Sequence, residues 1–235
     1  MNRRTLATAF AAALACAGVA LAQSDAAKLA LEYSNALKKN MELLREYSWK
    51  SRVEAQLAEG KTAAQIAQVR FDSKGEYERT VLGVESDMEK KRGIRGKIQK
   101  NRQEDARDLI QEIAKLLAGY SLPSTGKTVD FFEKATFGKS MVEGETIQIQ
   151  GKNMYKNDDT VTLWIDPTTQ LPKKLKVRTW VPKDEDDSER IWVDSVTIYD
   201  TLANGASYPK KSEVSILAKE MRLVIEEFDH IKQDG

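Results

Sequence analysis

The sequence predicts an α+β fold in which a curled antiparallel β-sheet, a half-barrel, is covered on its concave face by helices. Two stretches place apolar residues at the helical period, and the segments that follow each stretch alternate apolar and polar residues. Gly, Pro, Asn and Asp interrupt the alternating segments at short intervals, as hairpin turns do. Helices grouped beside runs of strands favour this architecture over a regular α/β alternation.

The first residues predict a cleavable export signal over residues 1–22. Arg3 and Arg4 supply a positive start, residues 6–15 form a short apolar stretch, and Ala20-Leu21-Ala22 has the small residues that a signal peptidase reads. We expect cleavage after Ala22 and a periplasmic mature protein. The apolar stretch is too short to read as a membrane-spanning helix.

Two alternatives concern this segment. Cys16 would become the N-terminus of a lipoprotein, but Ala13 stands where a bulky aliphatic residue is expected. The Arg3-Arg4 pair also permits the twin-arginine route, so the export route stays open. Cleavage after Ala22 removes the sole cysteine, which excludes disulfides, thiolate metal sites and a cysteine nucleophile from the mature chain.

The mature chain, residues 23–235, is expected to form one domain of nearly balanced charge. The full sequence has 37 Lys and Arg residues and 36 Asp and Glu residues. Removal of the signal takes away Arg3 and Arg4, so 35 basic residues remain against 36 acidic ones. Overall charge therefore gives no reason to expect a polyanionic partner, and any such signal must be local.

The elements follow in order along the chain. Residues 24–47 predict an amphipathic helix capped by Ser24 or Asp25. Three antiparallel strands are expected next, over residues 47–57, around 66–71 and over 77–82.

The second half repeats this order with more strands. The helical period returns over residues 87–119, and residues 128–137 predict a further short helix that contains Phe131, Phe132 and Phe137. From Glu143 to Lys232 strand follows strand. A sheet of some ten strands tends to curl, and helices laid in its concavity can leave an apolar pocket.

No motif in the sequence predicts catalysis, a metal or a cofactor. His230 is the only histidine, and it reads as an exposed residue at the end of a strand, without a serine elbow. Gly126-Lys127-Thr128 lacks the earlier glycine of a phosphate-binding loop. The acidic residues 184–187 lack the glycine and distal glutamate of a calcium loop, so we expect a solvated turn.

The most unusual local feature is a basic run without acidic residues. We define it as the basic patch, and its members are Lys90, Lys91, Arg92, Arg95, Lys97, Lys100 and Arg102. One interpretation is a docking surface for an anionic membrane or an acidic partner. The other is a solvated helix face, balanced by the acidic residues one to two turns later. Aromatic residues are absent from the run, which argues against nucleic-acid binding.

Several strands together resemble a known group. Leu163-Trp164-Ile165-Asp166-Pro167 followed by Leu171-Pro172-Lys173-Lys174-Leu175 is similar to the strand–turn–strand of the LolA/LolB-like periplasmic lipoprotein carriers, also called outer-membrane lipoprotein-sorting proteins. Tyr208-Pro209 and the strand Met221–Phe228 fit the same pattern. Residues 93–98 and Tyr47-Ser48-Trp49 resemble a set of uncharacterised exported bacterial proteins.

The resemblance implies a carrier that holds acyl chains in an apolar concavity. The implied partner is a lipid or a lipidated protein, and Arg52 is the candidate by position for the acyl-gating arginine of that group. Trp49, Trp164, Trp180 and Trp192 are the expected lining of the cavity. The leading hypothesis is therefore a non-catalytic periplasmic carrier. An envelope-sensing module that docks through the basic patch is the alternative, and a hydrolase ranks last.

Overall fold

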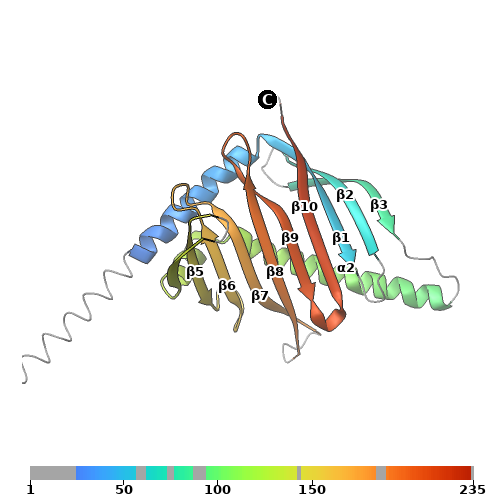
Figure 1. Ribbon diagram of the computed structural model, residues 1–235. Coiled ribbons are helices and arrows are strands. Elements are labelled where there is room, and N and C mark those ends of the chain that lie inside the picture. Colours follow the sequence, from blue (N-terminus) through green and yellow to red (C-terminus); the bar gives the residue numbers. More distant parts are fainter. Residues whose placement is uncertain are drawn as a thin grey trace, which may run out of the picture.

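The computed structural model shows one ten-stranded antiparallel sheet with helices on one of its faces (Figure 1). The structure describes residues 25–56, 62–72, 77–86, 94–141, 144–183 and 189–233. The predicted signal segment and the acidic residues 184–187 lie outside these ranges. Among the described residues, no helix combines the length and the apolar character that a membrane crossing requires.

The N-terminal third follows the predicted order of helix and three strands. A helix over residues 25–44 buries Ala26, Ala30, Tyr33 and Leu37 along one stripe, as the three- and four-residue spacing requires. The strands β1 (Tyr47–Gln56), β2 (Thr62–Phe71) and β3 (Tyr77–Ser86) then form an antiparallel meander. This part of the prediction is confirmed.

The helix is fixed to the sheet near its C-terminal end by one buried side chain. The Asn40 amide donates to the backbone oxygen of Ser207 at 2.7 Å, and the Ser207 N–H donates to the Asn40 carbonyl oxygen at 2.6 Å. Both groups are buried, so neither bond competes with water. The pair holds the last helical turn, which includes Leu44, over the start of strand β9.

The middle of the chain differs from the prediction in one element. Helix α2 (Ile94–Ser121) is confirmed, but the next helix, α3 (Thr125–Phe132), begins and ends earlier than expected. The hydroxyl of Ser124 caps α3 by accepting from the Lys127 N–H, and the chain turns after Phe132. Phe137 therefore lies on strand β4 (Thr136–Ser140), where it is half-exposed, and its assignment to a helix was wrong.

The remaining strands complete the sheet. They are β5 (Thr146–Lys152), β6 (Thr160–Ile165), β7 (Pro172–Pro182), β8 (Arg190–Thr201), β9 (Ser207–Ile216) and β10 (Met221–Lys232), with a short 3-10 turn η2 (Leu217–Lys219) before the last. The strand order is β3-β2-β1-β10-β9-β8-β7-β6-β5-β4. The final strand thus pairs with the first, and this one long-range contact joins the two meanders into a single curled sheet.

One face of the sheet, called here the inner face, packs against the helices (Figure 1). Its core joins Tyr33 of the first helix and Phe132 of α3 to inner positions such as Val161, Leu163 and Val177. A second cluster packs Ile113 of α2 against β7, β8, β9 and β10. The other face, called the outer face, carries mainly polar and charged side chains that alternate with these positions. The α+β fold with a curled antiparallel sheet is as predicted.

Candidate functional site

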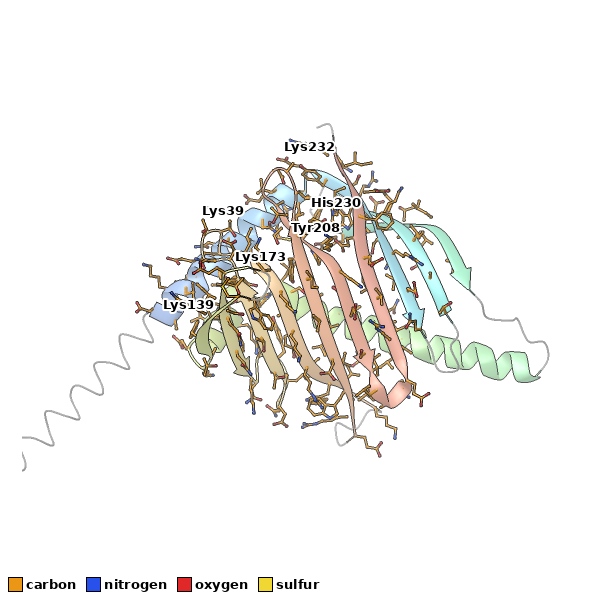
Figure 2. All side chains as sticks on the ribbon, in the orientation of Figure 1. Lys39, Lys139, Lys173, Tyr208, His230 and Lys232 are labelled. Atoms are coloured by element: carbon orange, nitrogen blue, oxygen red, sulfur yellow. The ribbon has the colours of Figure 1, made fainter. Side chains whose placement is uncertain are left out.

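A partly enclosed cavity of about 240 Å³ lies on the inner face, where the first helix ends above strands β1, β2, β3, β9 and β10. Its lining comes from all of these elements, and the lining residues are Leu44, Trp49, Val69, Tyr77, Arg79, Tyr208, Pro209, Glu227 and His230. Figure 2 shows Tyr208 and His230 near each other, at the end of β9 and β10 that also carries Lys232.

The floor of the cavity is a row of residues that the strand register places side by side. Trp49 of β1 pairs with Val69 of β2, and Val69 pairs with Arg79 of β3. On the other side of Trp49, the His230 imidazole stacks on the indole with 5.9 Å between ring centroids. Arg79 and His230 therefore stand at opposite ends of a floor formed by Trp49 and Val69.

A β-bulge places His230 on this face. On β10, Met221, Leu223 and Glu227 point inward by alternation, so His230 would point outward in a regular strand. Asp229 adopts a positive φ of 53°, and the pairing with β1 shifts register between Ser48 and Lys50. The extra residue turns His230 back to the inner face, which is how bulges re-aim side chains near functional sites.

His230 is thus partly buried, and its interpretation as an exposed strand end was wrong. Burial lowers the pKa of His230 below its usual 6.5, and the nearby Asp229 carboxylate opposes this shift only in part. The ring is therefore neutral at pH 7. Its Nε2 atom is buried and has no hydrogen-bond partner among the residues that the structure describes.

Glu227 is the second titratable group of the cavity. Burial raises the pKa of this carboxyl to about 8, while the neighbouring Trp49 indole and Arg79 guanidinium pull it downward. Within the described ranges, no residue forms an ion pair with Glu227 or with Arg79. Glu227 is consequently protonated for the most part at neutral pH and can donate a hydrogen bond.

Aromatic rings form the walls. Tyr77 stands edge-on to Trp49, with ring centroids 6.1 Å apart and planes at 87°. Tyr208 lies against His230 with centroids 4.1 Å apart. Burial raises the pKa of Tyr77 to about 12, and it also raises the pKa of Tyr208, so both hydroxyls stay protonated in the physiological range.

The structure brings Trp49 alone of the four predicted tryptophans into the cavity. The other three lie on the outer face, because each stands between two neighbours in its strand that point inward. Trp164 pairs there with Lys174, and Trp180 pairs with Trp192. Each is covered by cationic side chains at 4.4–5.6 Å from the ring centroid. Their expected place in the cavity is therefore corrected.

Arg52 is also on the outer face. It pairs across the ladder with outward Glu226, and its guanidinium forms an ion pair of 3.1 Å with Glu54. The arginine that lines the cavity is Arg79 of β3. The expectation that Arg52 faces the cavity was therefore wrong.

The basic patch cannot be placed with its side chains. Lys90, Lys91 and Arg92 lie outside the described residues, and Arg95, Lys97, Lys100 and Arg102 belong to the first turns of α2, where only the backbone is described. Its role stays a prediction. In the described part of the chain, no group of three or more His, Cys, Asp or Glu side chains has the arrangement of a metal site.

Of the nine residues that line the cavity, only Trp49 was predicted to do so, and the polar and aromatic residues missed include Glu227, Arg79 and Tyr77. The sequence contained a signal for Glu227. The alternating inward positions Met221, Leu223 and Ile225 are apolar, and the next inward position is a glutamate where another apolar residue is expected. Arg79 and Tyr77 follow from pairing with β2, and β3 alone shows no clear burial pattern, since its residues 77–84 are all exposed to some degree.

Comparisons with known proteins add similarities of overall arrangement. No protein-family model and no curated protein matches the chain. Among solved structures, it is similar to a DUF1329 family protein from Desulfovibrio piger, with 9% identity, 91% of this chain and 94% of that chain covered, and a TM-score of 0.41. It is also similar to a putative outer-membrane lipoprotein-sorting protein domain from Vibrio parahaemolyticus, with 10% identity, 91% of this chain and 94% of that chain covered, and a TM-score of 0.41. A third similar structure is a LolA superfamily protein from Nitrosomonas europaea, with 10% identity, 86% of this chain and 93% of that chain covered, and a TM-score of 0.37.

Proposed function

We propose that this chain is a binding or carrier protein for a lipid or a lipidated partner, and that one end of the bound amphiphile enters the inner-face cavity. The observation that carries the proposal is the cavity itself, which has an aromatic and aliphatic lining and a few convergent polar groups. This combination is typical of small-molecule sites. The proposed setting is the periplasm, as the N-terminal residues predict.

The size of the cavity limits how much of a lipid it can hold. A cavity of about 150 Å³ accepts benzene, so 240 Å³ has room for roughly ten non-hydrogen atoms. The rest of the amphiphile would lie outside. Val81 and Val84 offer apolar surface there, since they pair with inward positions of β2 and are 50% and 65% exposed.

Contact with a short stretch of alkyl chain gives useful affinity without catalysis. Each buried methylene contributes about 0.8 kcal/mol, so about eight methylenes contribute about 6 kcal/mol. That free energy corresponds to a dissociation constant on the order of tens of micromolar. A carrier that must release its cargo needs no higher affinity than this from the apolar part of the ligand alone.

The proposal is tested by filling the cavity. Val69→Phe adds a ring to the cavity floor, and Val224→Phe makes the same change at an outward position of β10. We expect titration calorimetry with a soluble short-chain phospholipid to show binding to the wild type and to Val224→Phe, and at least tenfold weaker binding to Val69→Phe. Leu44→Phe serves if Val69→Phe does not fold. Equal binding by all variants would exclude this cavity as the site.

A further inference from the structure

Two ionisable groups of opposite sign line the cavity and form no ion pair with each other: the Arg79 guanidinium and the Glu227 carboxyl, which is charged only after it loses its proton. Glu227 lies on β10 and Arg79 on β3, with β1 and β2 between them. Three interstrand steps of about 4.8 Å separate their backbones, and Trp49 and Val69 occupy the space between. Neither group is ion-paired to a described residue, although the Arg79 guanidinium lowers the pKa of Glu227 at a distance.

An alkyl chain would leave both groups unsatisfied. A buried polar group that loses its water without gaining a new partner weakens binding, and a charged group does so more strongly. Together the two groups would cancel much of what a short alkyl segment contributes in this volume. A ligand with a positive and a negative group would instead satisfy both ends of the floor.

The aromatic walls indicate which end takes the positive group. Trp49, Tyr77 and Tyr208 line the cavity together with Glu227, which lies close enough to both tyrosines to add to the increase in their pKa values that burial causes, and the faces of such rings attract an ammonium group. Among the lining residues, Glu227 is the only carboxylate. Arg79 lies at the exposed edge strand and matches a phosphate.

We propose that the cavity binds a zwitterionic ammonium–phosphate headgroup, with the ammonium against Glu227 and the aromatic walls and the phosphate paired with Arg79. This inference rests on the proposed function and specifies the chemical class of its ligand. A phospholipid headgroup and a free phosphodiester of the same kind share this chemistry, so the experiment must distinguish the two sources.

The direction of the pH dependence follows from the groups that face Glu227. Burial lowers the pKa of His230, so it is already neutral above pH 6.5, and the pKa values of Tyr77 and Tyr199 are about 12. Burial also raises the pKa of Tyr208. The nearby acids Asp229 and Asp200 are ion-paired with Lys50 and Lys210. Glu227 alone therefore titrates between about pH 6.5 and 9.

An ammonium ligand prefers the ionised carboxylate of Glu227, so its affinity must rise with pH and level off above about pH 8. The slope is at most about tenfold per pH unit. An anionic or purely apolar ligand prefers the protonated carboxyl, and its affinity must be constant or fall over the same range. The sign of the pH dependence therefore distinguishes the two ligand classes.

The experiment compares two phospholipids that differ only in the headgroup. Dihexanoyl phosphatidylcholine and dihexanoyl phosphatidylglycerol are titrated into the wild-type protein at about pH 6, 7 and 8.5, with glycerophosphocholine as the chain-free probe. Glu227→Gln removes the carboxylate at constant shape. Glu226→Gln, on the outer face beside it, is the matched control.

We expect the choline lipid to bind more tightly as pH rises, to lose at least about tenfold in affinity with Glu227→Gln at pH 8.5, and to be unchanged with Glu226→Gln. Tighter binding of the lipid than of glycerophosphocholine identifies a lipid source, and equal binding identifies a free phosphodiester. Equal affinity for the two lipids, or affinity for the choline lipid that falls with pH, overturns the headgroup inference while lipid binding stands. If neither lipid binds the wild type, the proposed function itself fails.

Discussion

Replacing Glu227 by glutamine should stabilise the protein, and the gain should grow with pH. A carboxyl whose pKa is about 8 in the folded protein and near 4.5 in the unfolded chain holds one extra proton in the folded state across that interval. The free energy of unfolding then falls by about 1.4 kcal/mol per pH unit as pH rises through the interval. The whole penalty amounts to at most about 5 kcal/mol above pH 8. Glutamine, which mimics the protonated acid, does not incur it.

Urea unfolding followed by circular dichroism at several pH values measures this difference. The variant and the wild type should be almost equally stable near pH 4.5, and the variant should be more stable by up to about 3.5 kcal/mol at pH 7. Glu226→Gln, whose side chain lies on the outer face, should show no such trend. A constant difference between Glu227→Gln and wild type across this pH range would refute the burial of Glu227 and with it the electrostatics of the cavity.

Other predictions concern the frame around the site. Gly151→Ala should lower the free energy of unfolding by about 1–3 kcal/mol, because a Cβ there would lie 2.5 Å from the buried Phe131 ring. Gly138→Ala is the control, since a Cβ at that position meets nothing within 4 Å. Thermal melts compare the two variants, and equal stability would contradict the packing. Asp159→Ala should cost about 3 kcal/mol or more, because its buried carboxylate accepts three backbone N–H groups and a tyrosine hydroxyl of α2. Asp158→Asn removes the exposed ion pair with Arg190 and keeps a side chain that suits the positive φ of 65° at this position, so it should change the free energy of unfolding by at most about 1 kcal/mol; similar losses in the two variants would refute this account.

Local periodicity predicted most of the elements, because strands such as β6, β7 and β8 bury the residues of one face. Val161, Leu163 and Ile165 are all buried on the inner face, as their alternation indicates. The same alternation shows that Trp164, between Leu163 and Ile165, must point to the opposite face. Its assignment to the cavity therefore ignored a signal that the sequence contains, and Trp180 and Trp192 repeat this pattern.

The site could not be assembled from local patterns, because it depends on two long-range features. β10 pairs with β1 across almost the whole chain, and no spacing in either strand specifies that partner. The bulge at Asp229 then reverses which residues of β10 face the helices. A residue with positive φ carries little sequence signal when it is an aspartate, since Asp adopts this conformation only in a suitable context. Hence His230 was placed on the wrong side.

The central claim is that an amphiphile enters the cavity beside Trp49, and quenching of tryptophan fluorescence by a brominated short-chain phospholipid tests it most directly. Of the four tryptophans only Trp49 lines the cavity, while Trp192 lies on the outer face under Arg178. The account predicts saturable quenching in the wild type and in Trp192→Phe, and loss of most of that quenching in Trp49→Phe. Quenching that persists in Trp49→Phe and disappears in Trp192→Phe would place the ligand on the outer face and contradict the account.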